Sequence, residues 1–245
     1  MSKRGFWIEV SGPFACFTRP EMKVERLSYE IPTPASMRAI FDSIMWKPAI
    51  YWKVNEIQIL NPIRWISVRR NETGRVATPG GKSIYIEDER QQRAGLFLRD
   101  VRYRVHAEFV FIPPEDRVTK SRFPVPESLQ ETGPEMLVDW KASTHDNVRP
   151  DETEAKYAAM FERRARKGAF FHKCYLGCRE FSADVELVDP KTNPPGPINE
   201  TRDLGWMLYD MDFADPKNIR PLFFRARMES GIIRVPDRDS DEVRG

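Results

Sequence analysis

Residues 101–112, VRYRVHAEFVFI, carry the clearest strand pattern in the chain. Apolar and polar side chains alternate along this segment, and one face collects a row of apolar residues: Val101, Tyr103, Val105, Ala107, Phe109 and Phe111. Alternation with a period of two is typical of a strand that buries one face. The segment therefore predicts a strand with one side on a hydrophobic core and the other side open.

Further strands and helices are predicted on both sides of this strand. Residues 6–10 and 53–60 have strand patterns, and Thr33-Pro34 supplies the N-cap and first-turn proline of a helix between them. Residues 151–167 predict a second helix, acidic at its start and basic at its end, and residues 181–188 alternate as a fourth strand. Strand, helix, strand, strand, helix, strand is the ferredoxin-like order, which RNA-recognition motifs share.

The fold class expected from this order is α+β, with a ferredoxin-like (RRM-like) N-terminal domain over residues 1–190. Residues 61–100 form a basic excursion with a glycine-rich tip, which predicts a projecting hairpin. Residues 113–150 are rich in proline and polar residues and predict a long insertion loop. After a linker that carries four prolines, residues 200–245 predict a small antiparallel β-rich C-terminal domain with a turn at Ser230-Gly231.

Composition places the chain among ordinary globular proteins, with 40% hydrophobic and 31% charged residues in a total of 245. We expect no membrane segment, because no apolar stretch approaches the roughly 20 residues that a spanning helix needs. We also expect no signal peptide, because the charged start runs directly into a strand. Three cysteines (Cys16, Cys174 and Cys178) give no disulfide framework, which suits a reducing cytoplasm.

No metal site is predicted. The spacing of His172, Cys174 and Cys178 fits no structural zinc pattern and lacks a fourth ligand, so buried structural thiols are the better interpretation.

Charge is clustered rather than strong overall, since the formal net charge is only +2. Three arginine-rich clusters stand out: Arg69-Arg70, the set Arg90, Arg93, Arg99, Arg102 and Arg104, and the run at residues 163–167. A solvated face is the ordinary explanation of such a cluster. The preference for arginine over lysine favours contact with phosphate, because the guanidinium group binds it with two parallel hydrogen bonds.

Residues 11–29, SGPFACFTRPEMKVERLSY, mix cations with aromatic rings, a pattern that suits phosphate contact and base stacking. Together with the Met-Trp-Lys-Pro at residues 45–48, this stretch closely resembles the subtype I-C (type d) member of the fifth Cas protein family. That family is a CRISPR-associated repeat-RNA endoribonuclease and Cascade subunit of the RAMP superfamily. The likeness covers most of the chain outside residues 113–150 and is carried by six segments: residues 16–26, 46–50, 68–72, 90–94, 176–181 and 202–208.

The resemblance implies a cytoplasmic enzyme that cuts CRISPR repeat transcripts at the base of the repeat hairpin. Such an enzyme keeps the 5′ handle and sits in Cascade with the large subunit and the backbone subunits. Residues 61–100 are similar to the family's thumb, which packs against the adjacent backbone subunit. The RNA-binding residues implied by the matching motifs are Phe17, Arg19, Lys23, Arg26, Lys47, Arg69, Arg70, Arg93 and Arg179.

The family's chemistry uses neither a metal nor a cofactor. The ribose 2′-OH attacks the adjacent phosphate and leaves a 2′,3′-cyclic phosphate, which requires a proton acceptor, a cation and a proton donor. Relatives supply a tyrosine or histidine before Trp-Lys-Pro and a Gly-Lys-His at the second helix. Here these positions hold Met45 and Ala155-Lys156-Tyr157. The resemblance therefore implies Lys156 as the stabilising cation and Tyr157 as a proton-transfer group.

His106 is a third catalytic candidate. It is out of phase with the apolar residues of its strand, so it is expected on the open face, where RNA would lie. A partly exposed strand histidine without a catalytic role is the simpler interpretation.

Three functions remain open at this point. The first is the endoribonuclease, and the second is a non-catalytic, handle-binding subunit of Cascade. The third is an unrelated ferredoxin-like binding domain, since fold alone assigns no function. Double-stranded DNA is an additional candidate partner.

Overall fold

The computed structural model describes residues 5–22, 24–47, 49–75, 78, 83–112, 153–192, 195–213 and 217–245. Lys23, Pro48, most of the hairpin tip and all of the expected insertion at residues 113–150 lie outside these residues. The elements in chain order are β1 (Gly5–Ala15), α1 (Pro34–Ile44), β2 (Ile50–Ile59), β3 (Trp65–Thr73), α2 (Ile86–Glu89), β4 (Arg90–Phe111), α6 (Glu154–Arg166), β5 (Asp184–Val188), β6 (Arg202–Asp212), β7 (Arg220–Glu229), β8 (Ile232–Arg234) and β9 (Val243–Arg244).

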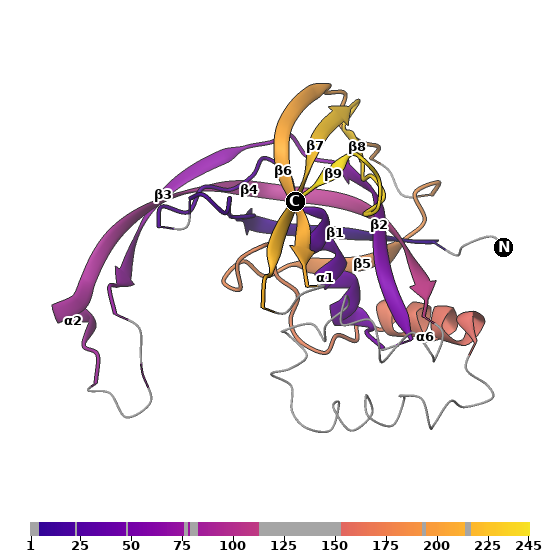
Figure 1. Ribbon diagram of the computed structural model, residues 1–245, viewed down its shortest axis with the longest axis horizontal. Helices are drawn as coiled ribbons and strands as arrows, with labels where there is room; N and C mark the ends of the chain where they lie inside the picture. The colour runs from indigo at the N-terminus through magenta and orange to yellow at the C-terminus, as the bar shows by residue number, and fades with distance from the viewer. Residues whose placement is uncertain are drawn as a thin grey trace.

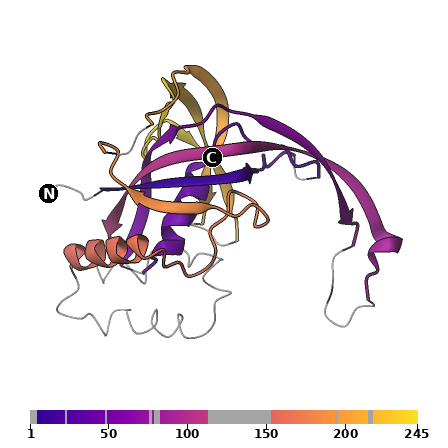
Figure 2. The same ribbon diagram turned by 180° about the vertical axis from the view of Figure 1, so that it is seen from behind.

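One antiparallel sheet organises the described part of the chain. Its strands follow the order β5-β1-β4-β2-β8-β7-β6, while β3 pairs with β4 and β9 pairs with β7. Figures 1 and 2 show α1 and α6 on the same side of the sheet. The prediction of an α+β protein built mainly on antiparallel strands is confirmed.

The C-terminal strands belong to this same sheet, because β8 pairs with β2 from Glu56↔Arg234 to Gln58↔Ile232. Figure 1 shows β6, β7 and β9 turned steeply relative to β1 and β4, so the sheet is strongly twisted. The expected turn at Ser230-Gly231 is present, and both residues have positive φ, of 49° and 77°.

β4 contains the predicted strand but begins earlier, at Arg90, and runs for 22 residues. Its first part pairs with β3 from Trp65↔Leu98 to Thr73↔Arg90. Figures 1 and 2 show this two-stranded ribbon curving away from the rest of the sheet towards α2. The ribbon therefore reaches well beyond the strand β1, whose pairing with β4 ends at Ala15↔Leu98.

The core lies between the sheet and the two helices. The apolar row of β4 is buried as predicted from Val101 to Phe109. Trp52 of β2 sits at the centre, with ring centroids 5.0 Å from Phe41 of α1 and 4.5 Å from Phe161 of α6. Aromatic burial of this kind supplies much of the hydrophobic free energy that fixes both helices on the sheet.

Helix α1 starts at the predicted cap, Thr33, and α6 starts at a cap that was not predicted, Thr153. In α1 the Ser36 backbone N–H donates to Thr33 Oγ1 at 3.2 Å, and in α6 the Lys156 N–H donates to Thr153 Oγ1 at 3.3 Å. Such caps satisfy backbone donors that the first helical turn cannot. Helix α1 ends at Ile44, and Met45 after it has extended backbone angles.

Candidate RNA interface and cleavage residues

The loop after β1 and the turn before β5 form one backbone unit. The Cys16 N–H donates to Leu176 O at 3.0 Å, and the Leu176 N–H donates to Phe181 O at 2.8 Å. Gly177 has φ of +81°, and a Cβ built there would lie 2.1 Å from Cys16 O. The turn predicted at residues 176–180 is therefore present, and it requires glycine at this position.

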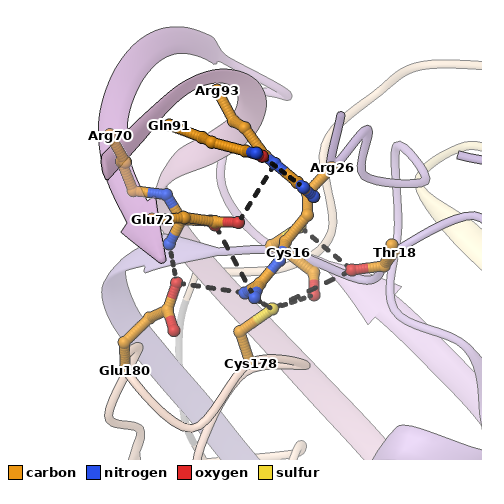
Figure 3. A network of polar contacts seen from close by, with 9 residues as sticks. All are labelled: Cys16, Thr18, Arg26, Arg70, Glu72, Gln91, Arg93, Cys178 and Glu180. Atoms are coloured by element: carbon orange, nitrogen blue, oxygen red, sulfur yellow. Dashed lines mark hydrogen bonds and ion pairs between the residues drawn. The ribbon is translucent and has the colours of Figure 1, made fainter. Parts of the chain in front are cut away.

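Three of the predicted RNA-binding arginines meet beside this unit. Arg26 comes from the loop, Arg70 from β3 and Arg93 from β4, and Glu72 of β3 and Glu180 of the turn lie between them (Figure 3). We call these five residues the arginine network. The structure brings together motifs that are more than 100 positions apart in the sequence.

The contacts of the arginine network are ion pairs. Glu72 is 3.1 Å from Arg70, 3.8 Å from Arg26 and 3.9 Å from Arg93, measured between nitrogen and oxygen. Glu180 accepts hydrogen bonds from Arg26, at 3.4 Å, and from Arg70. Most of these side chains keep a quarter to two fifths of their surface exposed. Three guanidinium groups and two carboxylates therefore form a partly exposed surface at the base of the ribbon, with one positive charge in excess among these five residues.

Other predicted RNA-binding residues have different surroundings. Phe17 is only 3% exposed and packs 6.1 Å from the Tyr103 ring, so it supports the loop from inside and does not offer its ring at the surface. The Arg19 guanidinium lies 4.5 Å over the buried ring of Tyr29. Arg69 and Arg179 are exposed beside the arginine network in sequence, while Lys47 is partly buried after α1.

Two arginines of the second cluster have a structural partner on the face of the sheet opposite the helices, which is covered at this point. Glu9 of β1 accepts from Arg102 Nε at 2.5 Å and from Arg104 Nη2 at 3.2 Å. Arg104 is 2% exposed and also donates to Pro195 O at 3.2 Å. A buried charge requires such partners. These two guanidinium groups are therefore part of the fold.

Lys156 and Tyr157 lie together in the first turn of α6. Lys156 is partly exposed, whereas Tyr157 is 6% exposed, with its ring centroid 6.2 Å from that of Phe111 at the end of β4. The N-terminus of a helix carries a partial positive charge, which adds to that of a lysine placed there. Glu154 places a carboxylate in the same turn, so Lys156 and the helix N-terminus supply positive charge beside one acidic side chain.

Met45 lies near the other end of α6. Its side chain is 1% exposed, and its carbonyl accepts from Trp52 Nε1 at 2.9 Å. The preceding carbonyl, of Ile44, accepts from Arg164 Nε at 2.5 Å. Arg164 follows Lys156 by eight residues, which is about 12 Å along a helix axis. The backbone next to Met45 is therefore held by the C-terminal half of α6, whereas Lys156 lies in its first turn.

His106 lies on the opposite face of the sheet from α6, as its phase predicts. Its ring centroid is 4.8 Å from that of Trp7, while Tyr157 lies against Phe111, on the apolar row of the same strand. Burial is the largest cause of a lowered pKa for His106, ahead of the opposing influence of Glu56 and Glu108. The structure thus brings Lys156 and Tyr157 together and leaves His106 apart from them.

Two features of the site were missed from the sequence. The first is the pair of carboxylates, Glu72 and Glu180. Each lies next to predicted RNA-binding arginines in the sequence, in Val68-Arg-Arg-Asn-Glu72 and Cys178-Arg-Glu180, and this proximity could have predicted the ion pairs. The second is the contact between Cys16 and Cys178, which no local sequence pattern could predict, since 162 positions separate the two residues.

The cysteines and histidine considered for a metal do not come together at one site. His172 Nε2 lies 2.9 Å from Ser43 Oγ of α1, which also hydrogen-bonds Cys174, whereas Cys178 is apart from both and lies against Cys16. Across the described residues there is no group of three or more His, Cys, Asp or Glu side chains that could hold a metal ion. Nor does that part of the chain contain a helix long and apolar enough to cross a membrane.

Comparison with known proteins identifies the class and then the family. The family model described as "CRISPR-associated protein (Cas_Cas5)" matches residues 7–121 and 140–236. The unmatched gap is narrower than the 113–150 insertion expected from the sequence. A solved structure named "Crystal Structure of CRISPR-associated Protein" is similar with a TM-score of 0.64 and 25% identity, covering 99% of this chain and 97% of the other.

Two curated relatives are each named "CRISPR pre-crRNA endoribonuclease Cas5d". The one from Mannheimia succiniciproducens is 38% identical, over 97% of this chain and 97% of its own length. The one from Thermus thermophilus is 34% identical, over 96% of this chain and 93% of its own length. The chain therefore belongs to the Cas5d family of CRISPR-associated proteins.

Proposed function

We propose that this chain is a metal-independent endoribonuclease that cleaves CRISPR repeat transcripts at the base of the repeat hairpin. It keeps the 5′ handle of the product and acts as a subunit of the type I-C Cascade complex, in contact with the large subunit and the backbone subunits. The observation that carries the proposal is near-full-length similarity, at 34% and 38% identity, to two relatives named as pre-crRNA endoribonucleases.

The fold supports a ferredoxin-like interpretation of the N-terminal part. Strands β5-β1-β4-β2 are neighbours in that order, α1 connects β1 to β2, and α6 lies between β4 and β5 in the chain. With β4 counted as the third strand and β5 as the fourth, this is the 4-1-3-2 arrangement of a split βαβ fold. The ribbon of β3 and the first half of β4 corresponds to the thumb, and residues 200–245 to the C-terminal β domain.

The arginine network supplies the proposed surface for the RNA backbone. Its three guanidinium groups form ion pairs with only two carboxylates, and the exposed Arg69 and Arg179 are next to network residues in the sequence. Phosphate oxygens compete well for partly exposed guanidinium groups, because arginine binds phosphate with two parallel hydrogen bonds. RNA bound here would lie at the base of the thumb.

Cleavage is assigned to the first turn of α6. The 2′-OH attacks the neighbouring phosphate in line, the P–O5′ bond breaks, and the products are a 2′,3′-cyclic phosphate and a 5′-OH. Lys156 stabilises the charge that develops on the phosphorane, and the helix N-terminus adds to its field. Tyr157 is next to it and is the proton-transfer candidate in this turn, since Met45 has no titratable group. His106 faces the other side of the sheet and is given no part in this step.

The test is product analysis with the purified chain and a repeat-hairpin RNA in EDTA. The proposal expects one cut at the hairpin base, a 2′,3′-cyclic phosphate on the upstream fragment and a 5′-OH on the downstream fragment. Products with 3′-OH ends, or cleavage that needs added Mg²⁺, would contradict the proposed chemistry.

Met45 favours one alternative, a non-catalytic subunit that binds the handle. Its side chain is buried and can move no proton at the position where relatives carry tyrosine or histidine. Tight binding of the same RNA without any cut would establish this alternative.

A further inference from the structure

Two cysteines from distant parts of the chain meet next to the arginine network. Cys16 follows β1, and Cys178 lies in the turn whose Leu176 carbonyl accepts the Cys16 N–H at 3.0 Å. Cys178 Sγ is 3.6 Å from the Cys16 carbonyl oxygen. Thr18 Oγ1 lies 3.4 Å from Cys16 Sγ and 3.9 Å from Cys178 Sγ (Figure 3). The two thiols also share a side-chain hydrogen bond, so their sulfurs are in contact and a disulfide between them is within reach of a side-chain rotation.

The surroundings of the pair distinguish its two sulfurs. Arg26 Nη1 is 3.7 Å from Cys178 Sγ, and Cys178 is partly exposed, whereas Cys16 is fully buried. The hydrogen bond from the Cys16 thiol, followed by Thr18 and Arg26, lowers the pKa of Cys178 to about 6, against burial and Glu180. The same hydrogen bond, together with burial, raises the pKa of Cys16. Cys178 is therefore the nucleophile of the pair, and Cys16 holds the proton.

Cys174 provides an internal comparison. It is 3% exposed, and burial raises its pKa to about 12. The chain thus has one activated thiol with a neighbouring thiol and one inert, buried thiol.

We propose that Cys16 and Cys178 form a redox-active dithiol whose modification site is Cys178 and whose co-reactant is a low-molecular-weight disulfide such as oxidised glutathione. The Cys178 thiolate attacks one sulfur of that disulfide, an S–S bond breaks, and one glutathione thiolate leaves. In the mixed disulfide the Cys178 sulfur is neutral, so it no longer stabilises the protonated Cys16 thiol as a thiolate acceptor does. The Cys16 proton passes to a released glutathione thiolate, the Cys16 sulfur attacks the Cys178 sulfur, the mixed S–S bond breaks, and the second glutathione thiolate leaves. The protein loses two electrons and the glutathione disulfide gains them.

Oxidation changes the charge around the arginine network. In the reduced state three guanidinium groups face Glu72, Glu180 and the Cys178 thiolate, which gives three positive and three negative charges. The disulfide is neutral, so the oxidised network carries one net positive charge and should bind RNA phosphate more tightly. This consequence, unlike the dithiol chemistry, rests on the proposed RNA-binding function.

The experiment treats the reduced full chain with oxidised glutathione at pH 7.5, alkylates it with iodoacetamide after denaturation, and measures the intact mass. Of the three cysteines, only Cys174 should be alkylated, and peptide mapping should show a Cys16–Cys178 link. Cys16→Ser should retain one glutathione on Cys178, and Cys174→Ser should form the link as the wild type does. Alkylation of all three cysteines after oxidation, or a link that includes Cys174, would overturn the proposal without requiring any variant to fold.

A second readout separates this proposal from the proposed function. Reduced and oxidised protein are titrated with repeat-hairpin RNA at the same salt concentration, and the oxidised form should bind several-fold more tightly. If the Cys16–Cys178 disulfide forms and the RNA affinity does not change, the dithiol proposal holds, but the arginine network is not part of the RNA interface.

Discussion

Glu9→Gln is expected to destabilise the fold strongly, because Glu9 neutralises two guanidinium groups inside the sheet. Glu9 is 8% exposed and Arg104 is 2% exposed, and their contact is 3.2 Å long. Removing one charge of a buried pair costs about 3–5 kcal/mol. Glutamine keeps an acceptor oxygen, so the lower end, about 3 kcal/mol, applies. In a chain of this size that loss lowers the melting temperature by about 6–12 °C.

The assay for this prediction is thermal unfolding followed by circular dichroism. Asp203→Asn is the matched control, since Asp203 also pairs with an arginine, at 2.6 Å, but both side chains are largely exposed. Its melting temperature should stay within about 2 °C of the wild type, because exposed pairs contribute little. Equal shifts for the two variants would refute the claim that Arg104 is held in the fold by Glu9.

Three further predictions concern the turn, the arginine network and pH. Gly177→Ala should lower the melting temperature clearly and Gly196→Ala should not, because an added Cβ meets the Cys16 carbonyl at 2.1 Å in the first case and nothing within 4 Å in the second. Glu72→Gln should tighten RNA binding about two- to fivefold in a filter-binding titration, because it releases guanidinium groups from an ion pair; weaker binding would show that the ion pairs shape the surface. Burial, opposed by Arg38, raises the pKa of Asp42 to about 7. Between pH of about 4 and 7 the Asp42 carboxyl is therefore more fully protonated in the folded state than in the unfolded state. Its contribution to the free energy of unfolding falls as the pH rises through that window. Asp42→Asn should remove this fall in a pH series of melting temperatures, and an unchanged pH profile would contradict the assignment.

The elements that alternate against the core were predictable from the sequence. The apolar row of β4 and the helix start at Thr33 depend on local patterns, and both are confirmed. Residues 61–100 were predicted as a projecting hairpin, but the bounds of its strands could not be predicted, because the half-buried positions of β3 hold Arg70 and Glu72 as well as apolar residues and so give no apolar alternation.

Long-range pairing limited what the sequence could say about the site. Arg102 and Arg104 have the pattern of a phosphate-binding cluster, yet their partner, Glu9, lies more than 90 positions earlier. The alternation of β4 correctly predicted that His106 lies opposite the apolar row. It could not predict that Lys156 and Tyr157 lie on the other side of the sheet, because α6 is placed by its own packing against Phe111 and Trp52.

The proposed cleavage of RNA by the first turn of α6 is tested most directly by the single-turnover cleavage rate of Lys156→Ala. Lys167→Ala is the control, since Lys167 is an exposed lysine at the other end of the same helix. Lys156→Ala should cut at least about 100-fold more slowly while its RNA affinity stays within about threefold of the wild type. Lys167→Ala should cut at the wild-type rate. A Lys156→Ala variant that cuts as fast as the wild type would place the chemistry elsewhere in the molecule.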